Sequence, residues 1–268
     1  MHQFSLAWLT VQGCPPMDHL RAAAGAGYDA VGLRLIAPLG LDLAHPIVGE
    51  PRLIRDLKAL AGDLGLGFLD GEVFTLRGDT EVAAWLPVLD TAAELGMGIM
   101  QITSEDADTA RAADNLGRIA DAAADRGIDM AIEFMRWRAA ATIGDAARLA
   151  AASGRGNVGI LLDALHLSRS GGSPADVAAL APGQVLYLQI CDAPAVPPAD
   201  DAACIAEARG HRMLPGEGGL WLRELMAVLP ADLPISIETP HAGDAALSHA
   251  ERARKGMEAT RRFLSLPD

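Results

Sequence analysis

The sequence predicts an α/β fold, a single (β/α)8 TIM barrel over residues 1–268. Short apolar runs alternate with longer segments rich in alanine and leucine, which is the rhythm of repeated βα units. Eight such pairs are expected, and a closed barrel satisfies eight strands that are each followed by a helix. A doubly wound open sheet is the alternative, but the turn after the first apolar run reads TVQGCPP and lacks the glycine-rich phosphate motif of that fold.

Each expected strand is a short run of apolar and β-branched residues bounded by polar or turn-forming ones. The expected strands span Phe4–Leu9, Ala30–Leu35, Gly67–Val73, Gly98–Thr103, Asp129–Phe134, Val158–Asp163, Val185–Ile190 and Pro234–Glu238. At 268 residues the chain matches one barrel of typical size rather than several domains.

The segments between these strands have the length and composition of helices. The expected helices span Pro16–Ala26, Pro51–Leu64, Glu81–Leu95, Ala107–Arg126, Gly144–Ala152, Pro174–Leu180, Leu220–Leu229 and His249–Leu264. Several end in a glycine just before the next strand, as in AGAGYDAV, LGLGF, LGMGIM and DRGIDMAI, which suits a tight turn from helix to strand. The longest irregular stretch, residues 191–219, is expected to be a loop that covers the active-site mouth, because it follows the seventh strand.

Composition narrows the classes of function. The net charge is −13 and the basic residues are scattered, so neither nucleic acid nor an anionic membrane is an expected partner. The three cysteines have no CxxC spacing, which argues against a disulfide framework and a thiolate zinc site. No signal peptide or membrane helix is recognisable at the start of the chain or elsewhere. We therefore expect a cytoplasmic protein.

Four expected strands in the second half of the chain end in a side chain whose oxygen can bind a metal: Glu133, Asp163, Gln189 and Glu238. In a barrel these consecutive strand ends meet at one mouth, where three carboxylates would repel one another without a cation. Helix capping explains any one of these acids but not the same placement on four consecutive strands. The pattern predicts a site for one hard divalent ion, such as Mn²⁺ or Mg²⁺.

Other polar residues are expected around the same mouth. His166 lies three residues after Asp163, so both side chains face the mouth if the strand passes into a helical turn; packing beneath the loop is the alternative for this histidine. Arg34 and Glu72, near the ends of the second and third strands, could line a polar pocket, and an ion pair between them explains them equally well.

The stretches AIEFMRW, GILLDALHLSRSGGSP, LYLQICDAP, HRMLPGEGGL and ISIETP resemble the sugar phosphate isomerase/epimerase family, which has the xylose isomerase-like TIM barrel. The resemblance implies that Glu133, Asp163 and Glu238 bind the metal. Gln189 stands where many members have histidine, and its harder oxygen favours Mg²⁺ or Mn²⁺ over zinc. The resemblance also implies that Arg212, His211 and His166 bind substrate. Gln189 and its surroundings also resemble bacterial 3-dehydroshikimate dehydratases.

The resemblance implies a divalent-metal-dependent isomerase or epimerase that acts on a ketose or related hydroxy-ketone through an enediolate. Glu133 and Glu238 are then the candidate bases. A lyase of the 3-dehydroshikimate dehydratase type is the alternative, because loss of a β-hydroxyl can follow the same first step. A catalytically inactive ligand-binding barrel is the third hypothesis. The expected partner is a small carbohydrate or polyhydroxy-ketone, and the family resemblance allows a homo-oligomer.

Overall fold

The computed structural model describes residues 2–37 and 43–265. Within these residues, eight parallel strands pair in chain order, and β1 also pairs with β8, so the sheet closes into a barrel. The strands are β1 Phe4–Leu6, β2 Ala30–Arg34, β3 Gly67–Leu76, β4 Ile99–Ser104, β5 Asp129–Glu133, β6 Val158–Asp163, β7 Val185–Ile190 and β8 Ile235–Ile237. The prediction of a (β/α)8 barrel is confirmed.

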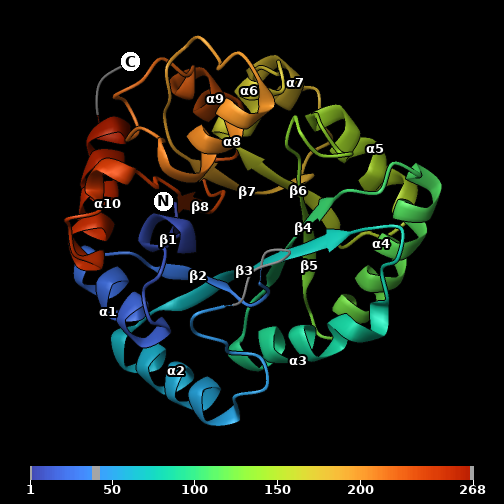
Figure 1. The fold of residues 1–268 in the computed structure, drawn as a ribbon, viewed down its shortest axis with the longest axis horizontal. Coiled ribbons are helices and arrows are strands. Elements are labelled where there is room, and N and C mark those ends of the chain that lie inside the picture. The colour runs from blue at the N-terminus through green and yellow to red at the C-terminus, as the bar shows by residue number, and fades with distance from the viewer. Residues whose placement is uncertain (1, 38–42, 266–268) are drawn as a thin grey trace.

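Helices surround the ring of strands (Figure 1). They are α1 Pro16–Ala26, α2 Pro51–Leu64, α3 Leu86–Leu95, α4 Thr109–Ala124, α5 Ile143–Ser153, α6 Ala164–Arg169, α7 Pro174–Ala178, α8 Asp201–Gly210, α9 Leu222–Val228 and α10 His249–Ser265. Short 3-10 turns lie at Trp8–Val11, Val82–Trp85 and Ala242–Asp244. None of the helices in the described ranges is both long and apolar enough to cross a membrane.

Glycines end several helices, as the sequence predicts. Gly27 after α1 and Gly96 after α3 have φ angles of 80° and 83°. This left-handed conformation is strained for residues with a Cβ atom, but glycine adopts it freely. The chain can therefore turn directly from each helix into the next strand, which keeps the strands in register around the barrel.

The connections after β6 and β7 contain helices that the sequence analysis did not predict. Helix α6 begins at Ala164, directly after β6. The stretch 191–219, expected to be irregular, contains α8, and the carboxylate of Asp200 caps this helix by accepting a hydrogen bond from the backbone N–H of Ala203. The proline- and aspartate-rich composition of this stretch does not predict a helix. Helix α8 forms there nevertheless, because one capping residue and favourable packing can stabilise a short helix.

The barrel interior contains a polar layer beneath the strand ends. The Gln101 side chain donates to Oδ2 of Asp70 at 2.7 Å, and the Tyr187 hydroxyl donates to the same oxygen at 3.1 Å. Burial, reinforced by Glu72, raises the pKa of Asp70 to about 7. A Cβ atom on Gly32 would lie only 2.6 Å from Oδ1 of Asp70, so a glycine leaves room for this carboxyl group. The layer joins three strands at the floor of the mouth.

His19 supplies a test of the packing of α1 against the barrel. Its ring is fully buried, Nε2 lies 3.2 Å from the accepting carbonyl oxygen of Leu6, and burial lowers its pKa to about 4 from 6.5. As the pH falls from about 6.5 to about 4, the unfolded chain takes up a proton that the folded protein excludes, so we expect His19 to remove roughly 3 kcal/mol of stability. Urea unfolding at about pH 7 and about pH 4.5 should show a smaller acid loss for His19→Gln than for wild type. An equal loss would contradict this assignment.

Candidate metal and active site

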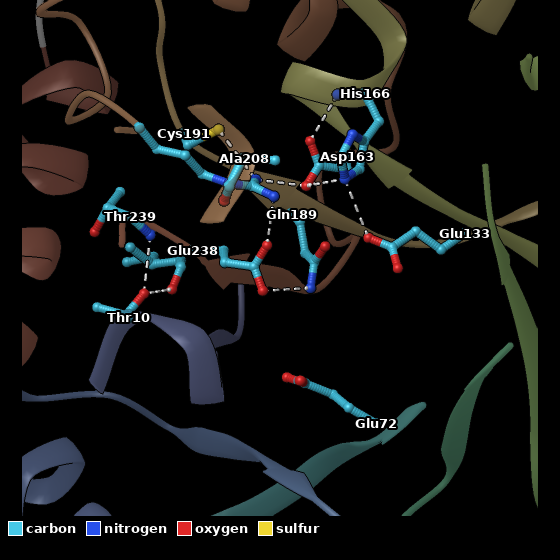
Figure 2. A network of polar contacts seen from close by, with 12 residues as sticks. Thr10, Glu72, Glu133, Asp163, His166, Gln189, Cys191, Ala208, Glu238 and Thr239 are labelled. Carbon is cyan, nitrogen blue, oxygen red and sulfur yellow. Dashed lines mark hydrogen bonds and ion pairs between the residues drawn. The ribbon is translucent and has the colours of Figure 1, made fainter. Parts of the chain in front are cut away.

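The ends of β5 to β8 bring four buried polar side chains into one connected cluster. Asp163 lies beside Gln189 in the strand register, Glu133 ends β5, and Glu238 follows β8 directly. All four side chains are at least nine-tenths buried. Figure 2 shows them facing a common centre. The geometry therefore gathers the strand-end residues that the sequence pattern singled out.

Glu133, Asp163 and His166 form one side of the cluster. Nε2 of His166 lies 3.5 Å from Oε1 of Glu133 and 4.0 Å from Oδ2 of Asp163. Asp163 also caps α6, because Oδ1 accepts from the backbone N–H of His166 at 2.9 Å. One ligand atom from each of the three residues lies within 4.8 Å of the others. Two carboxylates and an imidazole at this spacing fit a divalent cation.

The ring of His166 is held in place and kept neutral. Trp137 packs against it edge-on, with ring centroids 5.3 Å apart. Burial lowers the pKa of His166 to about 4, although Asp163 opposes the shift. A neutral imidazole has a lone pair available for a metal or for a substrate hydroxyl. The helical turn of α6 thus places this histidine at the mouth, as the sequence analysis expected if the strand passed into a helix.

Gln189 and Glu238 form the other side. Nε2 of Gln189 donates to Oε1 of Glu238 at 3.3 Å, which orients the amide. Its carbonyl oxygen, Oε1, is buried and has no hydrogen-bond partner among the described residues. An unsatisfied buried oxygen is unfavourable unless something binds it. A hard cation is one such partner, so the free oxygen of Gln189 fits the metal site that the neighbouring carboxylates suggest.

Arg212 joins the two sides of the cluster. Its Nη1 lies 2.6 Å from Oδ2 of Asp163, and its Nη2 lies 2.8 Å from Oε2 of Glu238. Nε donates to the carbonyl oxygen of Ala208 in α8 at 2.9 Å, which fixes the orientation of the guanidinium group. Substrate binding by Arg212 remains a prediction from the family resemblance. In the structure its guanidinium group neutralises two buried acids.

A second buried ion pair fixes α8, the helix that ends two residues before Arg212. Arg169 at the end of α6 binds Glu207 of α8 through two hydrogen bonds of 2.7 and 2.8 Å. Arg169 also donates to the carbonyl oxygen of Pro194 in the preceding loop. The paired geometry ties α6 to α8, so the two helices that flank the Asp163–Arg212 contact are bound to each other.

The electrostatic environment shifts the pKa values of the three acids in different directions. Burial, reinforced by Glu238 and Asp163, raises the pKa of Glu133 well above its usual range. Burial also raises the pKa of Glu238 to about 8, although Arg212 opposes it. For Asp163, burial acts in the same direction, but Arg212 and His166 outweigh it and the pKa falls below its usual value. Two glutamates that favour the protonated form therefore flank one ionised aspartate.

Other residues that the sequence placed near the mouth lie outside the metal-ligand cluster. His211 is exposed and packs edge-on against His241, with ring centroids 6.2 Å apart, rather than against the cluster. Glu72 reaches from β3 toward Glu238 and Gln189 from the opposite side of the mouth (Figure 2). The sequence analysis did not single out Asp70 or Tyr187, although an acid inside the apolar run GFLDGEVF was a signal that could have identified Asp70.

Comparisons with known proteins identify relatives over nearly all of the chain. A family model described as "Xylose isomerase-like TIM barrel" matches residues 20–263. A 3-dehydroshikimate dehydratase of Pseudomonas aeruginosa is 29% identical over 276 residues; the match covers 96% of this chain but 41% of that protein. The chain therefore spans less than half the length of this curated relative.

Solved structures with low sequence identity share the fold. A crystal structure of the IolI protein with a bound zinc atom has a TM-score of 0.81 and 17% identity, with 98% of each chain covered. A D-allulose 3-epimerase from Methylomonas sp., in complex with D-allulose, has a TM-score of 0.73 and 17% identity, covering 98% of this chain and 97% of that chain. At such identities the likeness establishes the barrel architecture.

Removal of the Arg212 charge tests its role in the cluster. Arg212→Met leaves Asp163 and Glu238 buried without their cation, so we expect a loss of about 3–5 kcal/mol of unfolding free energy. Added Mn²⁺ should raise the melting temperature of this variant more than that of wild type, because a metal cation can replace the missing charge. The matched control is Met at the exposed Arg209 of α8, which should change neither quantity. An Arg212→Met protein as stable as wild type would show that the acids do not need this partner.

Proposed function

Because the chain belongs to the xylose isomerase-like TIM barrel family, we propose that it is a divalent-metal-dependent isomerase or epimerase acting on a ketose or related hydroxy-ketone. The observation that carries the proposal is the pair of buried glutamates, Glu133 and Glu238, on either side of the ionised Asp163. Groups with perturbed pKa values that face one another in a mouth are characteristic of acid–base catalysts.

The residues that would hold the metal are Glu133, Asp163, Gln189 and Glu238, and the Nε2 atom of His166 lies within reach of the same position. When bound, the cation supplies a Lewis acid that polarises the substrate ketone and stabilises the charge that develops on its oxygen. Mn²⁺ and Mg²⁺ are the proposed ions, since carboxylate and amide oxygens dominate this donor set.

Proton transfer falls to the two glutamates. A glutamate with a raised pKa is a stronger base once it is ionised, and near neutral pH its protonated form is still available as a proton donor. In the proposed reaction, one glutamate removes the proton from the carbon next to the ketone, which gives an enediolate form of the substrate. Return of a proton to the other face of the same carbon gives an epimer, and return to the neighbouring carbon gives an isomer. Arg212 binds Glu238, one of the two glutamates, and the neighbouring Asp163, so it holds both carboxyl groups in place during the transfer.

A dehydratase acting on 3-dehydroshikimate is the second candidate. The similarity to the Pseudomonas aeruginosa enzyme and the glutamine at position 189 both favour it. Its first step is the same proton removal, followed by departure of a β-hydroxyl group, which takes up the proton as water leaves. Incubation with 3-dehydroshikimate separates the candidates, because dehydration creates a conjugated product that absorbs strongly in the ultraviolet, whereas isomerisation of a ketose does not.

Calorimetric titration of Mn²⁺ into chelator-treated protein tests the metal site. We expect one ion to bind per chain, and binding to be lost in Asp163→Ala, because this side chain contacts both His166 and Arg212 at the centre of the cluster. The exposed Glu217→Ala variant from the loop before α9 serves as the control and should bind normally. Absence of binding to the wild-type protein would refute the metal-dependent reaction.

Glu133→Gln and Glu238→Gln test the two proposed proton-transfer groups. Each substitution keeps the shape of the side chain but removes the carboxylate that carries the proton, so we expect kcat to fall about 10²- to 10⁴-fold on any ketose or 3-dehydroshikimate that the wild type converts. Circular dichroism should remain that of the wild type. Unchanged turnover in either variant would remove that glutamate from the mechanism.

A further inference from the structure

The wall of the mouth opposite the metal-ligand cluster carries an ion pair with unused hydrogen-bonding atoms. Arg34 at the end of β2 lies beside Glu72 of β3 in the strand register, and its Nη2 lies 2.7 Å from Oε2 of Glu72. The guanidinium group also stacks over the ring of Trp8 at 4.5 Å. These contacts hold both charged groups in fixed positions.

One polar atom on each partner makes no hydrogen bond within residues 2–37 and 43–265. Oε1 of Glu72 and Nε of Arg34 are buried and have no hydrogen-bond partner among the described residues. The Glu72 side chain is only 2% exposed. Buried donors and acceptors are nearly always paired in folded proteins. This adjacent acceptor and donor therefore indicate a ligand that has both a hydrogen-bond donor and a hydrogen-bond acceptor.

Glu72 faces the reaction centre rather than the outside of the barrel. Side chains two apart on a strand share one face, so Glu72 points into the barrel on the same side as Asp70, whose carboxyl group accepts hydrogen bonds from Gln101 and Tyr187 there. In Figure 2 its carboxyl group points toward Glu238 and Gln189 across the mouth. A substrate bound at the cluster would therefore extend toward Glu72.

We propose that Arg34 and Glu72 form a subsite for hydroxyl groups of an uncharged polyhydroxylated substrate, and that this subsite disfavours carboxylated and phosphorylated compounds. The position of the substrate rests on the proposed function. A hydroxyl group matches the two free atoms, because it donates to Oε1 of Glu72 and accepts from Nε of Arg34. An anionic group can only accept, and it meets the like charge of Glu72.

The charges around the mouth support the same substrate class. The carboxyl groups there belong to Glu72, Glu133, Asp163 and Glu238, and the guanidinium groups to Arg34 and Arg212. Each of these arginines is already paired with an acid. At the rim, Arg136 pairs with Asp201 and Arg138 with Glu105. When a divalent cation binds, its carboxylate ligands are ionised, and the four acids and two arginines then carry two excess negative charges that the cation balances. A neutral substrate leaves this site balanced, whereas an anion would need a cationic partner that these pairs do not supply.

Shikimate and its methyl ester test the proposal, because they share ring hydroxyls and differ in the charge of one group. Calorimetry should be done on Mn²⁺-loaded protein and on chelator-treated protein. We expect wild type to bind the ester at least about tenfold more tightly than shikimate, and Glu72→Gln to reduce that ratio about tenfold by freeing the charge of Arg34. Arg34→Gln should weaken binding of the ester without improving binding of shikimate.

Asp106→Asn is the matched control, since it removes the same charge from a buried carboxyl group that also pairs with an arginine, Arg111. It should leave the ratio unchanged. Three results on the ratio would each overturn the proposal: equal affinities in wild type, a ratio that Glu72→Gln does not alter, or a ratio that Asp106→Asn alters as much. No measurable binding of either compound would also overturn it. Failure to bind Mn²⁺ would overturn the proposed function alone, because the ratio in chelator-treated protein still reports on the Arg34–Glu72 subsite.

Discussion

The contact of Arg212 with Asp163 and Glu238 is the interaction on which the rest of the mouth depends. Two carboxylates so deeply buried are unfavourable unless a cation accompanies them. Arg212 supplies that cation from the connection between β7 and β8. A segment outside the barrel wall therefore neutralises the buried acids at the mouth. Burial and the charges of Glu238 and Asp163 raise the pKa of Glu133 well above its usual range, and Arg212 offsets only part of that rise.

Polar groups occupy two successive levels of the barrel interior. Asp70, Gln101 and Tyr187 form the lower level. Asp70 lies two residues before Glu72 on β3, and Tyr187 lies two residues before Gln189 on β7. Side chains two apart on a strand share one face, so the lower network sits directly beneath the mouth. Hydrogen bonds at this level resist sideways movement of β3, β4 and β7. The strands beneath the upper side chains are therefore held in place, and accurate proton transfer requires such fixed positions.

The fold and the strand-end cluster could be predicted from sequence because both are periodic. Apolar runs at regular spacing specify a strand and helix repeat, and one polar residue at the end of each of four such runs, such as Glu133 or Asp163, specifies a shared edge. Local pattern cannot specify contacts between residues far apart in the chain. The pairing of Arg212 with Asp163, 49 residues away, is such a contact. Local pattern also cannot give the direction of the His211 side chain, since one residue along an extended segment reverses the direction of a side chain.

The bidentate contact between Arg169 and Glu207 has a consequence for how this sequence can diverge. Arg169 ends the helix that Asp163 caps, and Glu207 lies one residue before the Ala208 carbonyl that orients Arg212. The segments that carry Asp163 and Arg212 are therefore joined by a second ion pair, between Arg169 and Glu207. Exposed residues of α8 are free to vary while this brace persists. A lineage that lost either brace residue would have to rebuild the mouth, so Arg169 and Glu207 are expected to change together or not at all.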